Sequence, residues 1–326
     1  MLSQSPPRPS PAANSLHSFP RHGGRFIPSA VSFFLPLISD TIPLPGRGLL
    51  LRSSTTVVFC SIDDLIPISG KPLTGFPEFL ESLFDAGIPC IWLTSRSRLQ
   101  LDSTIRKLGH SEPFIAEGGA GVYLAEDYFH LKPARTTRLG RFTCIPVATP
   151  QPAATEALAL LSEQTGVTVV SLRSLSPREL VQNTGLERHE AESMRQRDFD
   201  ELFFIAGATD AQILNFQRQA SLLKYSVRPR GSLWSLAVNP SLATCVRELC
   251  KLFDRALRGH TFSVALANSL EAPGLFPACD RAILLTDRSS PVDVPSTPSH
   301  SSAKSVPLFQ ADTWALTLEA IQTRHS

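Results

Sequence analysis

One segment, Val57 to Leu65, limits what this chain can fold into more than any other stretch. It begins as an apolar, β-branched run and breaks abruptly into Asp63 and Asp64. This pattern indicates a strand that is buried on both faces of a parallel sheet. In open α/β sheets ligands bind outside the carboxyl ends of such strands, so we expect a functional site at this end.

Strand and helix patterns alternate along the first third of the chain. We expect strands at 55–62, 89–93, 114–116 and 122–124, and helices at 76–86 and 98–108. Each helix stops at a glycine, Gly87 or Gly109, the residue type that most easily takes the left-handed conformation found after helix ends. The alternation predicts a doubly wound, parallel α/β sheet.

The middle of the chain has a different pattern, with amphipathic helices and half-exposed strands. Its expected strands are at 141–147, 167–171, 202–205, 225–229 and 233–238, and its expected helices at 152–164, 177–184, 188–196 and 210–223. The first pattern then returns, with a helix at 241–257, strands at 262–267 and 282–286, and a helix at 314–323. We therefore predict an α+β cap domain inserted into the α/β core.

These patterns divide the chain into four parts. We expect an extension over 1–54, the first part of the core over 55–137, the cap over 138–235, and the second part of the core over 236–326. Ser and Pro are frequent in 288–307, which predicts a mobile loop within the last part.

Composition excludes several classes of protein. Of the 326 residues 42% are hydrophobic, which is enough for a sizeable core and excludes global disorder. A net charge of +2 predicts neither a nucleic acid nor a membrane surface as partner. The six cysteines are scattered, without a C-x-x-C pair, so we expect reduced core thiols and no zinc site.

Residues 1–39 differ from the rest because they contain no acidic residue and are rich in Pro, Ser and Arg. Three interpretations stay open: a targeting or export segment, a disordered extension, and a start of translation assigned too far upstream. The apolar run from Phe26 to Ile38 is too short to span a bilayer. We expect a cytoplasmic protein, with organelle targeting or export as the alternative.

Several stretches are similar to motifs of the haloacid dehalogenase superfamily. Residues 57–65 resemble a strand followed by Asp-x-Asp-Gly-Thr, and IPCIWLTSRSR at 88–98 resembles the second motif, a strand ending in a hydroxyl. EPFIAEGGA at 112–120 is similar to PFIVENGA, and NTGL at 183–186 with RQRDFDELF at 195–203 is similar to LTGL…KQREYDEPF. In this order, over about residues 55–326, the stretches resemble the mannosyl-3-phosphoglycerate phosphatases, which belong to the group with a type IIB cap.

The resemblance implies a catalytic site in which several reactive groups are replaced. It places Ser61 where the family has its nucleophilic aspartate, Asp63 as the carboxylate that handles the leaving-group proton, and Thr94 as a phosphoryl-binding hydroxyl. The family's Asp-Lys-Gly-Lys-Ala-Val falls on 241–246, so Thr244 stands at a lysine position. Its Gly-Asp-Ser-Pro-Asn-Asp falls on 267–272, so Asn268 stands where a metal-binding carboxylate is expected. The family uses Mg²⁺; with Asp63 and Asn268 as its candidate ligands, we expect no tight binding of Mg²⁺ here.

The same resemblance predicts substrate contacts from the second motif, the glycine-rich segment and the cap. The residues are Ser95, Arg96, Glu117, Gly119, Gln196, Arg197, Asp200 and Glu201. Plainer interpretations stay open, namely a simple tight turn at 117–119, a turn-capping role for Asn268, a solvated acid at Asp64, and a solvated patch formed by Arg195, Arg197, Asp200 and Glu201.

The resemblance therefore implies a protein of the mannosyl-3-phosphoglycerate phosphatase type that has lost its nucleophile, lysine and metal carboxylates. We expect an inactive or impaired pseudophosphatase that binds a phosphosugar or sugar-glycerate ligand, or a related enzyme as protein partner. The alternative is an active, Mg²⁺-dependent phosphatase acting on mannosyl- or glucosyl-3-phosphoglycerate, with Asp63 or a recruited water in place of the nucleophile.

Overall fold

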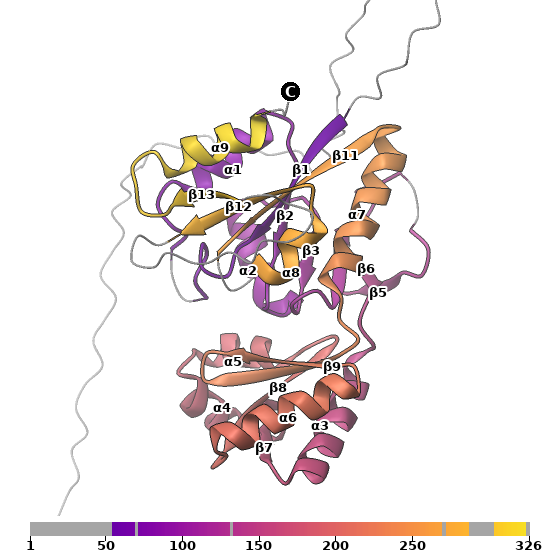
Figure 1. The fold of residues 1–326 in the computed structure, drawn as a ribbon, viewed down its shortest axis with the longest axis vertical. Helices are drawn as coiled ribbons and strands as arrows, with labels where there is room; N and C mark the ends of the chain where they lie inside the picture. The colour runs from indigo at the N-terminus through magenta and orange to yellow at the C-terminus, as the bar shows by residue number, and fades with distance from the viewer. Residues whose placement is uncertain (1–53, 69–70, 131–132, 269–271, 287–302, 324–326) are drawn as a thin grey trace, which may run out of the picture. The chain divides into compact units, whose positions relative to one another are not determined.

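Two β-sheets organise the part of the chain that the structure, a computed structural model, describes (Figure 1). That part comprises residues 54–68, 71–130, 133–268, 272–286 and 303–323. The expected extension lies outside the described residues except for Ser54, and so does most of the expected loop over 288–307.

The larger sheet forms the core, and its described strands stand in the order β13-β12-β11-β1-β2-β3-β4-β6-β5. Their bounds are β1 (Ser54–Ser61), β2 (Cys90–Leu93), β3 (Phe114–Ala116), β4 (Gly121–Ala125), β5 (Thr137–Leu139), β6 (Phe142–Pro146), β11 (His260–Ala267), β12 (Arg281–Thr286) and β13 (Lys304–Pro307). From β13 to β3 neighbouring strands are parallel, whereas β4, β6 and β5 pair antiparallel. The strand order reverses between β1 and β11, which is the position where sheets of this kind bind ligands.

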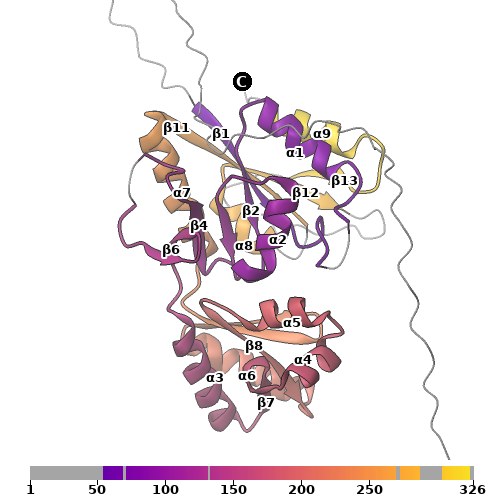
Figure 2. The same cartoon turned by 180° about the vertical axis from the view of Figure 1, so that it is seen from behind.

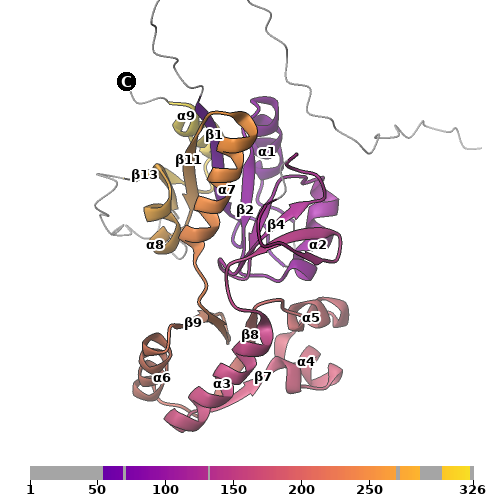
Figure 3. The same cartoon turned by 90° about the vertical axis from the view of Figure 1, so that its right-hand side faces the viewer.

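Helices cover both faces of the core sheet (Figure 3). Val58 and Cys60 of β1 point to the face covered by α1 (Phe76–Asp85), α2 (Arg98–Leu108) and α9 (Thr313–Gln322). Val57 and Phe59 point to the other face, covered by α7 (Leu242–Leu257), α8 (Ala272–Leu275) and the short helix η2 (Phe276–Ala278). Successive strand residues point to opposite faces, so a run buried on both sides must be apolar throughout. The predicted doubly wound α/β core is confirmed.

The second sheet belongs to the inserted cap and has the order β7-β8-β10-β9, with antiparallel pairs (Figure 2). Its elements are α3 (Gln151–Thr165), β7 (Thr168–Ser171), η1 (Leu172–Ser174), α4 (Pro177–Thr184), α5 (Arg188–Arg195), β8 (Asp200–Ala206), α6 (Asp210–Leu222), β9 (Tyr225–Arg230) and β10 (Leu233–Val238). Helices α3 and α6 pack on one face, against Phe203 and Leu236. Helices α4 and α5 pack on the other face, against Leu202 and Leu233.

The expected bounds of the cap, 138 and 235, differ from those of its sheet. Strands β5 and β6 pair with each other, and β6 pairs with β4, so all three belong to the core sheet. Strand β10 continues to Val238. The half-exposed alternation at 141–147 predicts a strand correctly, but alternation is a local property and cannot show which sheet the strand joins.

Two further differences concern short or polar strands. Strand β5 has no counterpart in the sequence prediction, because three residues reading Thr-Arg-Leu carry little periodicity. Strand β13 lies within the stretch predicted as a mobile loop, where it pairs with β12. In the described ranges, no helix has the length and apolar character needed to cross a bilayer.

Candidate functional site

Three polar residues follow the carboxyl ends of neighbouring core strands. Ser61 ends β1, Thr94 follows β2, and Asn268 follows β11. Residue 61 pairs with Leu93 in β2, and Cys60 pairs with Leu266 in β11, so these strand ends lie at the same level of the sheet. The structure therefore brings the predicted nucleophile position, hydroxyl position and metal position to the point where the strand order reverses.

Asp63 is held in place by donors from the loop after β2. Thr94 Oγ1 donates a hydrogen bond to Oδ1 of Asp63, and the Ser95 N–H donates to Oδ2 at 2.7 Å. The N-cap at Ser97, which begins α2 with a capping box to Gln100, fixes this loop. The two family residues that the chain retains, Asp63 and Thr94, are thus direct neighbours.

The Arg96 guanidinium supplies positive charge inside this site. Its Nε lies 3.5 Å from Oδ1 of Asp63, and its Nη2 donates to the carbonyl oxygens of Asp63 and Ile66. Burial lowers the pKa of Arg96, and the carboxylates of Asp63 and Asp64 act in the opposite direction. Arg96 thereby fixes the turn after β1, in which Asp64 is exposed, as expected of a solvated turn acid.

The side chains around Asp63 do not provide the set of oxygen ligands that a tight Mg²⁺ site needs. Mg²⁺ needs several oxygen ligands in octahedral geometry, usually including carboxylates. Both carboxylate oxygens of Asp63 already accept hydrogen bonds, Ser61 and Asn268 offer neutral oxygens, and Arg96 brings a cation. Within the described ranges, no group of three His, Cys, Asp or Glu side chains is placed to hold a metal ion.

Thr244 lies at the start of α7, where the resemblance expects a lysine. Its N–H donates to Oγ of Ser241 at 3.2 Å, and the two hydroxyl oxygens are 2.8 Å apart. Gly119 fixes this helix start, because a Cβ at residue 119 would come within 2.8 Å of the Leu242 nitrogen. Gly119 has φ +97°, a conformation that favours glycine. Its role in the structure is to allow this close approach.

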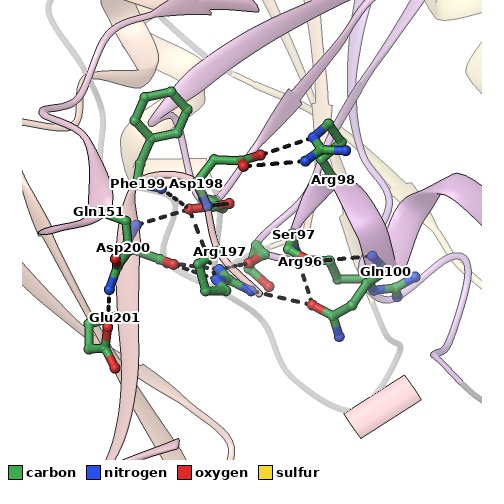
Figure 4. A network of polar contacts seen from close by, with 12 residues as sticks. Arg96, Ser97, Arg98, Gln100, Gln151, Arg197, Asp198, Phe199, Asp200 and Glu201 are labelled. Carbon is green, nitrogen blue, oxygen red and sulfur yellow. Dashed lines mark hydrogen bonds and ion pairs between the residues drawn. The ribbon is translucent and has the colours of Figure 1, made fainter. Parts of the chain in front are cut away.

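Glu117 joins the core to the cap through contacts with Asp198, Phe199 and Asp200, which are labelled in Figure 4. This side chain accepts hydrogen bonds from three consecutive backbone N–H groups of the cap, those of Asp198 (2.9 Å), Phe199 (2.8 Å) and Asp200 (2.9 Å). Burial raises the pKa of Glu117, and the nearby Asp200 adds to this, whereas Arg197 and the N–H donors act in the opposite direction. The segment 117–119 is therefore more than a simple tight turn.

Arg197 and Asp200 complete this connection. Arg197 forms a two-point ion pair with Asp200, and each side chain is 2% exposed. Arg197 also donates to the backbone oxygen of Ser95 in the core at 2.7 Å. Burial acts to lower the pKa of Arg197, but the Asp200 and Glu117 carboxylates outweigh it and raise this pKa above the ordinary value.

Glu201 is buried inside the cap. Its carboxylate accepts hydrogen bonds from Gln151, from Thr155 at 3.0 Å and from Ser171, and Arg173 lies 3.2 Å away. The alternative of a solvated patch is wrong for Arg197, Asp200 and Glu201, which are all buried. Gln196, in contrast, is exposed.

A cavity of about 510 Å³ lies beside Asp63. Four of the predicted site residues line it, namely Asp63, Ser95, Arg96 and Arg197. The other predicted residues are not among those that line this cavity: Ser61, Thr94, Glu117, Gly119, Gln196, Asp200, Glu201, Thr244 and Asn268. Sequence reasoning did not predict the remaining lining residues as part of the site; they are Asp64, Ile68, Gln100, Leu186, Met194, Leu202, Pro229, Arg230, Gly231 and Leu233. Most come from separate cap elements, and no local pattern distinguishes them from ordinary core or surface residues.

The comparison with curated proteins finds distant relatives of one kind. The chain is 23% identical over 208 residues to the glucosyl-3-phosphoglycerate/mannosyl-3-phosphoglycerate phosphatase of Methanococcoides burtonii, covering 63% of this chain and 75% of that protein. The expected resemblance to the mannosyl-3-phosphoglycerate phosphatases is confirmed. A second protein of this description, from Persephonella marina, is 26% identical over 137 residues, which is 41% of this chain and 49% of the relative. No family model matches the chain.

Solved structures of the haloacid dehalogenase superfamily share the fold. The subclass IIB sugar phosphatase BT4131 superposes with a TM-score of 0.53 at 14% identity, covering 82% of this chain and all of that one. The phosphatase BT1666 of Bacteroides thetaiotaomicron gives 0.54 at 16% identity, covering 85% and 99%. The core with its inserted cap is therefore haloacid-dehalogenase-like.

Proposed function

We infer that this protein is a pseudophosphatase of the mannosyl-3-phosphoglycerate phosphatase type. It binds a phosphorylated ligand in the cavity beside Asp63 but hydrolyses this ligand weakly or not at all. One observation carries this proposal. The residue at the end of β1, beside the fixed carboxylate of Asp63, is Ser61. A serine cannot form an acyl-phosphate, and a hydroxyl needs a neighbouring base to become a nucleophile.

The charges around the site support the same proposal. Phosphoryl transfer depends on metal ions and cationic donors that stabilise the developing charge, each commonly supplying several kcal/mol. Where the family has a lysine, Thr244 forms a hydrogen bond with Ser241. The Arg96 side chain forms an ion pair with Asp63 and donates hydrogen bonds to backbone oxygens. The described part of the site is thus stabilised by its own internal contacts and does not need a metal to balance it.

Restoring the reactive groups tests the proposal directly. Ser61→Asp alone places a second carboxylate beside Asp63 without a metal ion or a lysine to balance it, so it should destabilise the protein or leave it inactive. Ser61→Asp combined with Thr244→Lys, Asn268→Asp and Ala272→Asp restores the groups together, and catalytic groups that act as a unit are strongly non-additive.

We expect Mg²⁺-dependent phosphatase activity on a mannosyl-phosphoglycerate from the combined variant alone. Turnover by the parent protein above roughly 1 s⁻¹, an ordinary enzymatic rate, would refute the proposal.

Metal titration provides an independent test. With Ser61 and Asn268 at the carboxylate positions, we expect no saturable Mg²⁺ binding in the low-millimolar range, whereas the combined variant should bind. Isothermal calorimetry measures both proteins under the same conditions. A tight 1:1 site in the parent would contradict the proposal and favour the active enzyme.

The active phosphatase stays the second candidate because the contact between Asp63 and Thr94 is intact beside an accessible cavity. A single-turnover assay with and without Mg²⁺ separates the two candidates. A related enzyme as protein partner and a cytoplasmic location stay predictions, and co-purification and fractionation of cells would test them.

A further inference from the structure

Four exposed leucines gather on the outer helices of the cap. They are Leu160 on α3, Leu214 and Leu222 on α6, and Leu223 directly after α6, and the two helices pack against each other. In the described ranges eight large hydrophobic side chains are exposed, and the other four lie on separate elements. A single exposed leucine is ordinary, whereas a group of them on neighbouring elements marks an interaction surface.

Helix α6 presents two of these leucines together with a positive charge. Leu214, Arg218 and Leu222 follow one another at intervals of four residues, so they lie along one side of the helix. All three are exposed, and so is Lys224 just beyond the helix. The acidic Asp210 stands in the first turn. Beyond that turn, the charge that α6 offers to solvent is therefore positive.

Helix α3 presents the opposite charge. Glu156, Leu160 and Glu163 are spaced by four and three residues, so they lie on one side of the helix, and all three are exposed. No lysine or arginine occurs in α3. In the described part of the chain, neither of these glutamates nor Arg218 forms an ion pair. We call this surface the outer cap face, formed by Glu156, Leu160, Glu163, Leu214, Arg218 and Leu222.

The outer cap face points away from the candidate site. Helices α3 and α6 pack on one side of the cap sheet, and α4 and α5 on the other (Figure 3). The cavity beside Asp63 is lined from the second side, by residues that include Leu202 and Leu233. A partner bound to the outer cap face leaves that cavity open.

We propose that the outer cap face is the interface of a homodimer, in which α3 of one copy packs against α6 of the other. The two copies in a twofold dimer bury the same surface, so this surface must be complementary to itself. An acidic helix beside a basic one, with leucines on both, meets this condition.

The charges select one way of pairing the two layers of helices. A twofold axis that runs along the helices, between the layers, places α3 over the α6 of the second copy. Glu156 and Glu163 then lie over the helix that carries Arg218, and the leucines of the two copies meet between them. Pairing α3 with α3 instead places glutamates against glutamates, and like charges at an interface are unfavourable.

Sedimentation velocity of the full chain at increasing protein concentration tests this inference. We expect a monomer–dimer equilibrium that shifts toward the monomer as salt is added, because salt screens exposed charges. Leu214→Gln should weaken the dimer at least about tenfold, since it removes apolar surface from the interface. Phe84→Gln is the matched control, because Phe84 on α1 is 68% exposed, against 66% for Leu214, and lies outside the outer cap face.

Charge reversal tests the pairing of α3 with α6. Glu156→Lys combined with Glu163→Lys makes both helices basic and should weaken the dimer about tenfold. Adding Arg218→Glu makes α3 basic and α6 acidic, so the dissociation constant should return to within about threefold of the parent value. Thermal unfolding of each variant checks that it is folded.

Each other outcome counts against the inference. A parent chain that stays monomeric at every concentration would overturn it and leave the proposed function standing, since the cavity lies on the other side of the cap sheet. A dimer that Leu214→Gln and Phe84→Gln affect equally has its contact elsewhere. Failure of Arg218→Glu to restore association would show that α3 does not meet α6 across the interface.

Discussion

At the scale of single residues, the charged groups between core and cap are the most consequential. Glu117, Arg197 and Asp200 are all buried, and Nε of Arg197 lies 4.0 Å from Oε2 of Glu117. Taking such charges out of water is costly, and their mutual attraction offsets this cost only while every partner is present. Their value therefore lies in fixing how the cap meets the core, since each group is satisfied in one arrangement.

Removing Arg197 should show this dependence. Arg197→Met leaves the Asp200 and Glu117 carboxylates buried without their cation, so we expect a loss of about 3–5 kcal/mol in the free energy of unfolding. Arg138→Met is the control, because it breaks an ion pair to Glu126 in which both side chains are exposed, and it should change little. Urea unfolding monitored by fluorescence measures both. Equal losses in the free energy of unfolding for Arg197→Met and Arg138→Met would contradict the proposed role of the buried Arg197.

At the scale of secondary-structure elements, strand β4 of the core packs directly against the segment that enters the cap strand β8. Phe199, just before β8, belongs to the core cluster and is 3% exposed. It packs where β4 has a glycine, because a Cβ on Gly121 would lie 2.6 Å from the Phe199 ring. A glycine in a strand often marks such a close approach of another segment.

A double-mutant cycle measures this contact. Gly121→Ala should cost about 1–3 kcal/mol, because the added methyl group overpacks a buried site. Phe199→Leu shortens the opposing side chain, so the double variant should lose less stability than the sum of the two single variants. Chemical unfolding of the parent, the two single variants and the double variant gives the coupling free energy between residues 121 and 199. Strict additivity would mean that the ring and the strand do not meet.

At the scale of the whole molecule, one unit spans residues 51–326, and the functional strand ends lie where its core sheet reverses order. The cap chain leaves the core after β6 and returns to it at α7. The Ser241 N–H donates to the Gly119 oxygen at 3.1 Å, which fixes the returning segment against the loop that carries Glu117.

The segment before this unit should be dispensable for stability. Residues 1–50 precede the first expected core strand, so deleting them should leave the melting temperature nearly unchanged. Thermal unfolding of the full and shortened chains compares them directly. A fall of more than about 4 °C, corresponding to more than about 1 kcal/mol for a domain of this size, would show that the segment contributes to the fold.

The sequence by itself determined most of the elements and their order, with β5 and β13 as exceptions. Helix Arg98–Leu108 and strand Leu233–Val238 have the predicted bounds, and Gly109 ends its helix with φ +63° as expected. Hydrophobic periodicity and glycine at helix ends are local properties, which a chain carries before it folds. The family motifs were equally local, and the structure brings two of their residues, Asp63 and Thr94, into direct contact.

Only the tertiary structure decided which of these residues are buried and which face the cavity. Arg197, Asp200 and Glu201 have side chains typical of protein surfaces, yet they are buried because their partners come from distant segments. The lining of the cavity by Leu186, Met194, Leu202 and Leu233 likewise exists only after α5, β8, β10 and the loop between α4 and α5 have packed together. Burial and pairing depend on contacts between residues far apart in the chain, and a pattern read along one segment carries no information about those contacts.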